Sequence, residues 1–184
     1  MPNVDELARP YSVNFFSESG FYDGKHKINT ADDLHLIAAA PPVIVMPKQK
    51  TKYLDVPGAN GKLDLSELLT GGPIYENRSG SIEFYTARGY KRSTALVPMH
   101  ELASWEWFRV LARYIHGQRL KMVLETDLNH YYEGRFEVEY DHDDSMNRGK
   151  ITVNYDLAPY RTTCVIDGET ITDMSGAPDG GKIL

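Results

Sequence analysis

An alternation of apolar and charged residues constrains the fold of this chain most strongly. It occupies residues 131–140. Successive side chains of a strand point to opposite faces, so the pattern predicts a sheet with one buried and one wet face. The segment 150–157 repeats it, with Ile151, Val153 and Tyr155 predicted to point inward. The alternating residues of the first segment are Phe136, Val138 and Tyr140 on one face and Arg135, Glu137 and Glu139 on the other.

Other segments rich in β-branched and aromatic residues predict further strands. Pro41, Pro42 and Pro47 flank the segment 43–46 and favour an edge position for it. Residues 28–40 are compatible with a loop followed by either a short strand or a helical turn, and 127–130 read as a turn. Strands are expected within 11–22 and at 43–46, 51–56, 81–86 and 120–126, and a small hairpin is expected around Asp167 and Gly168.

One amphipathic helix is predicted within residues 99–116. Apolar residues recur there at spacings of three and four, the period of one helix face. Gly117 follows as a C-terminal cap. The apolar stripe consists of Leu102, Trp105, Phe108, Leu111, Ala112 and Ile115. We take Trp105, Phe108, Leu111 and Ile115 as the helix residues that enter the core.

These elements predict a mostly β fold (α+β): a β-sandwich with one α-helix between strands and an extended hairpin or loop. A chain of 184 residues suits one domain. A domain of about 150 residues buries roughly 70% of the surface of its unfolded chain, so a core forms without disulfides or metal. The single cysteine, Cys164, excludes an intrachain disulfide. From residue 173 onward the composition suggests a flexible tail.

The segment 53–69, YLDVPGANGKLDLSELL, joins a strand, a turn and an acidic leucine-rich run. Asn60-Gly61 predicts a type I′ turn. Asp64 and Glu67 have the spacing of a helix cap. Leu65, Leu68 and Leu69 then line one face of a single helical turn, which Gly71-Gly72-Pro73 ends.

No motif of this sequence predicts catalysis, a cofactor or a metal site. The acidic cluster 141–144 lacks the glycine and glutamate of a calcium loop, so a solvated loop is the better reading. The six histidines are scattered, and Cys164 has no neighbouring base or second cysteine. We therefore expect that the protein is not an enzyme.

Two other functional classes stay open on the residues alone. Asp127 and Glu133, or Asp143, are carboxylates of the type that a small hydrolase uses. Tyr131, Tyr132 and Trp107 are aromatics that would serve a stand-alone β-sandwich module binding carbohydrate or protein. The basic stretch 88–92 reads as a solvated loop.

The net charge of -6 argues against a dedicated nucleic-acid binder. The first residues, MPNVDE, lack the basic and apolar regions of a secretory signal, so none is expected. The longest apolar run, 36–46, is interrupted by prolines and is too short to cross a membrane, so no membrane partner is expected.

An ordered set of segments resembles the N-terminal domain of the distal tail protein (Dit) of long-tailed bacteriophages. The set starts with Gly24-Lys25-His26 followed by ADDLHLI. It continues through the pair Pro41-Pro42, KTKYLDVPGANGKLDLSELLTGGPIYENRSGSIEFYT, IHGQRLKMVLETD, YYEGRFEV and KITVNYDLAPY. It covers residues 12–161. The combination of the V-P-G-x-x-G turn with the L-D-L-S-E run carries the resemblance most sharply. The motif positions taken from the resemblance are Val56, Pro57, Gly58, Asn60, Gly61, Leu63, Asp64, Leu65, Asn77 and Arg78.

The resemblance implies a fold related to phage tail tube folds, in a Dit-like N-terminal domain spanning 1–161. Residues 162–184 would be a short C-terminal extension, with no galectin-like second domain. It also implies a non-enzymatic ring, commonly a hexamer, that joins the tail tube to tip or baseplate proteins. The protein would sit in the virion tail after assembly in the bacterial host cytoplasm. A tail tube protein, or another tail-hub protein of this fold, is the sister reading.

The acidic composition suits this role, because DNA passes through a tail lumen only in transit. A negative wall repels phosphates. The leucines at 63, 65, 68 and 69 would pack on the sandwich or on the next subunit.

Overall fold

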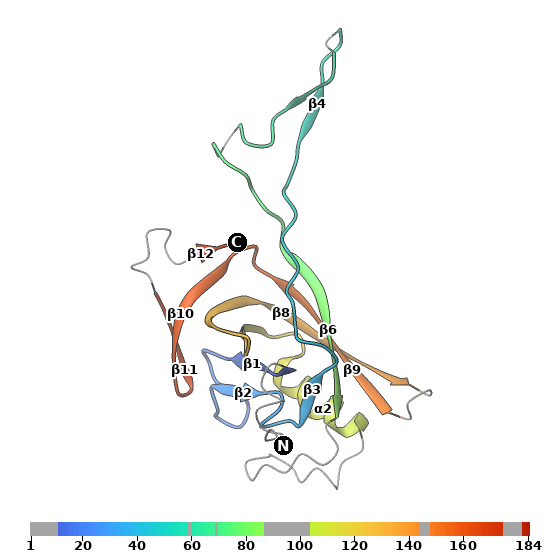
Figure 1. Cartoon of the computed structure of the whole chain (residues 1–184), viewed down its shortest axis with the longest axis vertical. Helices are drawn as coiled ribbons and strands as arrows, with labels where there is room; N and C mark the ends of the chain where they lie inside the picture. Colours follow the sequence, from blue (N-terminus) through green and yellow to red (C-terminus); the bar gives the residue numbers. More distant parts are fainter. Residues whose placement is uncertain (1–10, 59, 69, 87–103, 144–147, 175–181) are drawn as a thin grey trace, which may run out of the picture.

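The computed structural model describes residues 11–58, 60–68, 70–86, 104–143, 148–174 and 182–184. Antiparallel strands dominate this part of the chain, and one helix, α2 (Ser104–Ile115), lies between strands in the sequence. A slender arm rises from a curled body (Figure 1). The protein thus has the mostly β fold with one helix and an extended hairpin that the sequence predicts.

The body contains one large sheet in the order β2-β1-β7-β8-β9-β6-β3. β10 pairs with β8 and carries β11 and β12, whereas β4 and β5 form a separate two-stranded sheet. The strands of the main order are β1 (Val13–Phe16), β2 (Lys27–Asn29), β3 (Leu36–Ala38), β6 (Arg78–Thr86), β7 (Arg119–Leu124), β8 (Asp127–Asp143) and β9 (Arg148–Leu157). The others are β4 (Tyr53–Asp55), β5 (Lys62–Asp64), β10 (Arg161–Asp167), β11 (Thr170–Asp173) and β12 (Lys182–Ile183).

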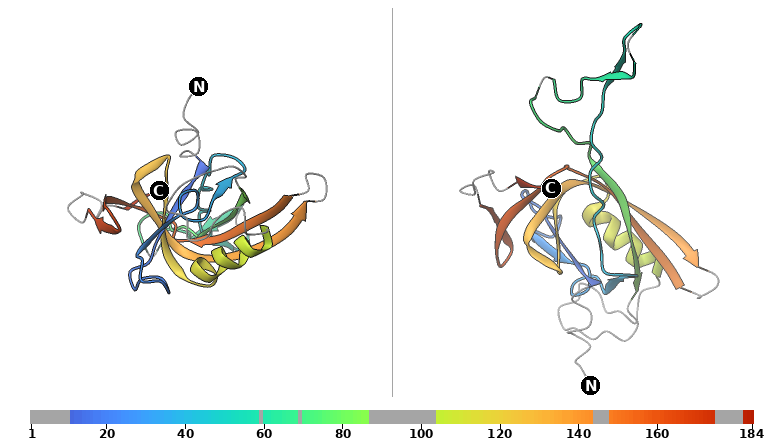
Figure 2. Two further views of the ribbon diagram at one scale, coloured as in Figure 1. Left: turned by 90° about the horizontal axis from the view of Figure 1, so that it is seen from below. Right: turned by 45° about the horizontal axis from the view of Figure 1, so that its top comes forward.

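The sheet curls around its apolar face (Figure 2). Cross-strand pairs confirm the predicted alternation: Phe136 lies opposite Tyr155, and both side chains are buried. One step further along, Val138 lies opposite Val153, again with both buried. The curl brings β2 and β3, the two ends of the strand order, to the same side of the molecule, where residues 30–35 connect them. Two layers therefore enclose the main apolar core.

The helix confirms its predicted position but buries a different tryptophan. Trp107 is 1% exposed, whereas Trp105, predicted as a core residue, is 47% exposed with Arg109 beside its ring. Leu111 and Ile115 are buried as predicted, and Phe108 is half-buried against Tyr140. Apolar residues form two neighbouring stripes on this helix. The stripe that contacts β8 and β9 is the one that becomes buried. Gly117, with a φ of 72°, follows the helix end as expected.

The hairpin β10–β11 covers the other face of the sheet around β1 and β7. Its turn contains Gly168, with a φ of 57°, and confirms the predicted hairpin. A second apolar cluster lies beneath it, and burial there raises the pKa of Cys164 to about 11. β12 pairs with the start of β10, so residues 182 and 183 form a strand within the segment predicted as a flexible tail, and residues 175–181 of that segment lie outside the described residues. The cluster consists of Phe16, Val123, Tyr131 and Cys164.

The predictions for the segments 43–46 and 127–130 are wrong. Residues 43–46 are not a strand, because the flanking prolines remove backbone donors and no ladder forms there. Residues 127–130 belong to β8, and the turn falls at Glu125-Thr126. A strand as long as β8 pairs with β7, β9 and β10 at once, and these ladders outweigh the local turn preference of 127–130.

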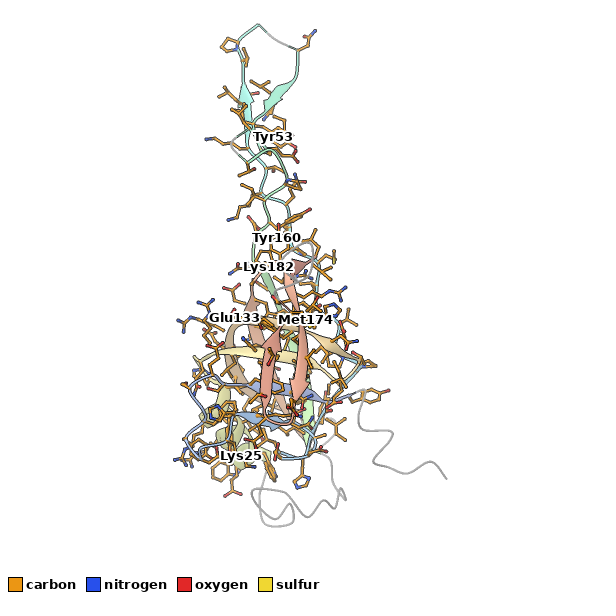
Figure 3. The ribbon with its side chains drawn as sticks, turned by 90° about the vertical axis from the view of Figure 1, so that its left-hand side faces the viewer. Lys25, Tyr53, Glu133, Tyr160, Met174 and Lys182 are labelled. Carbon is orange, nitrogen blue, oxygen red and sulfur yellow. The ribbon has the colours of Figure 1, made fainter. Side chains whose placement is uncertain are left out.

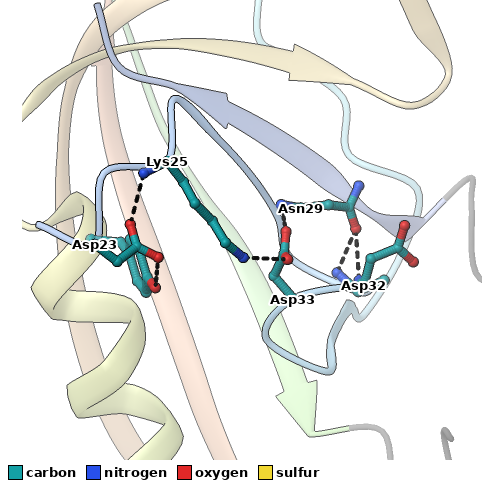
Figure 4. A network of polar contacts seen from close by, with 7 residues as sticks. Asp23, Lys25, Asn29, Asp32 and Asp33 are labelled. Atoms are coloured by element: carbon teal, nitrogen blue, oxygen red, sulfur yellow. Dashed lines mark hydrogen bonds and ion pairs between the residues drawn. The ribbon is translucent and has the colours of Figure 1, made fainter. Parts of the chain in front are cut away.

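Polar side chains shape the connection between β2 and β3 (Figure 4). The Asn29 Oδ1 accepts hydrogen bonds from the backbone N–H groups of Ala31 and Asp32, at 2.8 and 2.9 Å. Asp33 Oδ2 accepts from the Asn29 N–H at 2.7 Å, and Asp33 Oδ1 lies 3.3 Å from Lys25 Nζ. These bonds satisfy backbone groups of a tight connection that lies outside the strand ladders.

Candidate assembly interface

The arm, defined as residues 48–76, is the most prominent surface feature. Backbone bonds join its two strands near the body: the Lys50 N–H donates to Ile74 O, and the Glu76 N–H donates to Lys48 O, both at 2.8 Å. Figure 3 shows Tyr53 far out on the arm and Tyr160 near its base. The arm is thus a two-stranded ribbon with both faces in solvent.

The ribbon is amphipathic. Leu54 lies directly opposite Leu63, so both side chains point to one face, and they are 50% and 51% exposed. The opposite face carries Asp55 and Lys62, which form an ion pair at 3.6 Å. An isolated two-stranded ribbon is at best marginally stable in water, so an apolar face on one is unfavourable without a partner.

Exposed apolar side chains are concentrated on the arm and on the segment that enters it. These regions hold nine of the fifteen large apolar side chains that are exposed in the described part of the chain. The nine are Val43, Val45, Met46, Tyr53, Leu54, Val56, Leu63, Leu68 and Ile74. A concentration of this kind marks an interaction surface rather than ordinary scattered exposure.

The tip loop differs from the predicted two-residue turn. β4 ends at Asp55 and β5 begins at Lys62, so residues 56–61 form a longer loop that includes the exposed Val56 and Pro57. The positive φ angles in it belong to Gly58 (84°) and Gly61 (85°). A type I′ turn also needs positive φ at Asn60, but His35 is the one non-glycine residue with positive φ among those described.

The leucine-rich run forms a hydrogen-bonded turn and no helix. Asp64 accepts bonds from the N–H and the hydroxyl of Ser66, so it does cap the turn. Glu67 accepts from Gln49 at 3.3 Å instead of completing a capping box. Leu65 is half-buried and Leu68 is exposed, and Leu69 lies outside the described residues. Leu63 and Leu68 therefore do not pack on their own sandwich, and the other predicted packing, on the next subunit, stays a prediction.

The arm root, defined as Val45, Arg78, Tyr132, Tyr155 and Pro159, anchors the arm to the body. Arg78 is 2% exposed, and its Nε donates to Pro159 O at 2.8 Å. Its Nη1 donates to Val45 O at 3.3 Å, and burial lowers the pKa of Arg78 from its ordinary value. The guanidinium thus joins the segment that enters the arm to the β9–β10 connection.

Asn77 and Gly80 support the same root. The Asn77 side chain donates to Asp156 Oδ2 at 3.2 Å and holds the start of β6 against β9. At Gly80, an added Cβ would lie 2.4 Å from the Tyr155 hydroxyl, so the absence of a side chain lets this tyrosine pack there. The sequence reasoning singled out Asn77 and Arg78, but it missed Gly80 and Leu54, which carry no local signal beyond a strand pattern.

The residues of the alternative functions do not assemble into a site. Tyr131, Tyr132 and Trp107 are buried and offer no aromatic platform to a sugar. Asp127 is engaged by His130 at 2.8 Å and by Arg161 at 3.1 Å.

Glu133 is likewise engaged, by Arg119 at 2.7 Å. The Asp143 side chain, residue 144 and the basic stretch 88–92 lie outside the described residues. Within the described part of the chain, no three acidic, histidine or cysteine side chains gather as a metal site would require, and no helix there is long and apolar enough to span a membrane.

Comparisons with known proteins bear on the fold alone. No protein-family model and no curated protein matches the chain. Among solved structures, the chain is similar to the crystal structure of SPP1 Dit, described as a paradigm of the hub adsorption apparatus in phages infecting Gram-positive bacteria. The TM-score is 0.50 at 12% identity, and the match covers 82% of this chain and 52% of that one. This chain therefore has a Dit-like fold and spans about half of the SPP1 protein.

Proposed function

We propose that this protein is a structural subunit of a phage or phage-like tail: a distal tail (hub) protein that forms a ring between the tail tube and the tip or baseplate proteins. The observation that carries the proposal is the arm, whose Leu54–Leu63 pair presents an apolar face that its own body leaves uncovered. The similarity of the fold to a phage hub protein supports the same class of function.

In this proposal the arm of one copy packs its apolar face on the next copy. Contacts between unlike surfaces generate a ring when the rotation between copies closes. Burying apolar area contributes roughly 25 cal/mol per Å², so covering Leu54, Leu63 and their neighbours favours assembly. The copy number expected from the resemblance is six. DNA would cross the ring only in transit, and the protein would reside in the virion tail after assembly in the host cytoplasm.

Sedimentation velocity combined with negative-stain imaging tests the proposal. We expect the wild-type chain to form closed rings at high concentration, and Leu54→Asp with Leu63→Asp to remain monomeric. Lys62→Ser, on the opposite face of the same ribbon, serves as the matched control and should still assemble. Circular dichroism checks that each variant is folded.

The outcomes separate the readings. A wild-type chain that stays monomeric at every concentration, with or without tail tube protein, contradicts the proposal. Rings that stack into long open tubes on their own would instead identify a tail tube protein of the same fold. Equal assembly of the leucine variant and the control would show that the arm's apolar face is not the contact.

A further inference from the structure

Two rows of like charge stand on opposite parts of this chain. The lysine ladder, Lys48, Lys50 and Lys52, occupies alternate positions at the base of the arm. The acidic ladder, Glu137, Glu139 and Asp141, occupies alternate positions on the wet face of β8. All six side chains are exposed, and none forms an ion pair with another described residue.

The surroundings of the acidic ladder reinforce its charge. Its face is continuous with the outer residues of β9 and β6, and these strands add Asp156 and Glu83. Lys150 lies opposite Asp141, but its Nζ is already 3.2 Å from Glu83 Oε1. Arg135 donates to Gly117 O at 3.0 Å. On β8, β9 and β6 this face therefore carries six carboxylates, one of them Glu133 paired with Arg119, and the two cations Arg135 and Lys150, both of which are engaged.

The two ladders do not meet within one subunit. The arm extends away from the body on one side, while β8 carries Glu137 to Asp141 toward the opposite end of the sheet (Figure 1). Their spacing nevertheless matches, because alternate residues of an extended strand repeat at about 6.8 Å on one face. The two rows are opposite in charge and share one repeat, and neither has an ion-pair partner within its own subunit. They can therefore pair between two copies of the chain.

We infer that the lysine ladder of one copy pairs with the acidic ladder of the next copy. This inference rests on the proposed ring and names one of its contact surfaces. The contact joins unlike surfaces, so every copy offers one ladder to each neighbour, as ring closure requires. Pairing of charge rows would set the register of the arm on its neighbour, while the apolar face that includes Leu54 and Leu63 contributes buried area.

Charge reversal tests the pairing by sedimentation velocity at low salt. Lys48→Glu, Lys50→Glu and Lys52→Glu together place carboxylates against carboxylates. We expect this variant to associate at least about a hundredfold more weakly than wild type. The reciprocal variant, Glu137→Lys, Glu139→Lys and Asp141→Lys, should show the same loss. The matched control reverses three other exposed cations, Arg109, Arg113 and Lys182, and should assemble like wild type.

Mixing the two reversed variants gives the decisive result. Each is unable to pair with itself, but the acidic arm of one meets the basic sheet face of the other. We expect a 1:1 mixture to assemble, with the two variants alternating around an even-numbered ring. Raising the salt from about 50 to about 500 mM should weaken wild-type assembly, because screening shortens the reach of exposed charges.

The outcomes distinguish the ladder pairing from the proposed ring on which it rests. If wild type forms rings and the reversed variants form them equally well, the ladder pairing is wrong and the proposed ring stands. If the lysine ladder binds a labelled DNA duplex in fluorescence anisotropy while its reversal leaves assembly unchanged, the pairing is also overturned. If wild type remains monomeric throughout, both are wrong.

Discussion

The guanidinium carbon of Arg78 lies 5.4 Å from the centre of the Tyr132 ring. This contact places a cation inside the body where the arm begins. The face of an aromatic ring attracts such a cation. The hydrogen bonds from Arg78 to Val45 and Pro159 tie the arm to the β9–β10 connection at the same point. The orientation of the arm therefore depends on a residue inside the body.

Replacing Arg78 with alanine should lower the free energy of unfolding by about 2–3 kcal/mol, because two partly buried carbonyls lose a charged donor. Arg78→Lys should lose a similar amount of stability, since an ammonium lacks the planar fork that reaches both carbonyls. Urea denaturation measures both effects. Arg109→Ala, on the exposed side of α2, is the control and should stay within about 0.5 kcal/mol of wild type. Similar losses in the two alanine variants would contradict the anchoring role.

Replacing each of the two tryptophans of α2 should have sharply different effects on the free energy of unfolding. Trp107→Ala opens a cavity in the core and should cost about 3–5 kcal/mol. Trp105→Ala removes a half-exposed ring and should cost much less. Chemical denaturation followed by circular dichroism measures both without relying on the tryptophan signal. A larger loss of stability in Trp105→Ala than in Trp107→Ala would mean that the helix buries the face that contains Trp105, as the sequence pattern alone suggests.

Gly80→Ala should destabilise the arm root. The new Cβ would lie 2.4 Å from the hydroxyl of the buried Tyr155, and overpacking of this kind costs about 1–3 kcal/mol. Gly72→Ala is the matched control, because nothing lies within 4 Å of its Cβ position. Thermal melts should show a lower Tm for the first variant and little change for the second. An unchanged Tm for Gly80→Ala would mean that Tyr155 moves aside without cost.

His35 should make stability depend on pH. Its burial against Trp107 lowers the pKa of His35, so the folded state takes up this proton less readily than the unfolded chain. Stability is therefore lost as the pH falls below the ordinary value of about 6.5, by at most about 1.4 kcal/mol per pH unit for one proton.

The test compares wild type with His35→Asn in urea titrations between about pH 7.5 and pH 5. Asparagine tolerates the φ of 52° at this position. We expect a shallower loss of stability toward acid in the variant. Parallel curves for the two proteins would rule out His35 as the source.

Local patterns predicted most elements of the body but not the details of the arm. The strands around Val138 and Val153 and the helix at Leu111 follow from periodicities of two and 3.6, which neighbouring residues impose. The tip turn and the helical turn after Asp64 were predicted from short motifs. The motif Asn60-Gly61 gave way to a longer loop because the pairing of Asp55 with Lys62 leaves six residues to close.

The candidate interface was likewise only partly predictable from the sequence. The segment around Gly58 and Leu63 and the residue Arg78 were recognised in the sequence as a set. Their roles as an exposed arm and a buried anchor depend on contacts with Pro159 and Tyr132, more than fifty residues away along the chain. The row of lysines at 48, 50 and 52 is visible in the sequence, but the inference that it pairs with another row depends on the structure, which places the acidic row on one face of β8.

The sequence by itself determined that this protein is a mostly β fold with one helix and a protruding segment, because side-chain periodicity acts between near neighbours. The tertiary structure alone decided that Trp107 and not Trp105 enters the core, and that Leu54 and Leu63 remain in solvent. It also set the lysine and acidic ladders apart. These outcomes depend on how the sheet curls and where β8 and β9 meet the helix, and no residue encodes such long-range packing in its immediate neighbours.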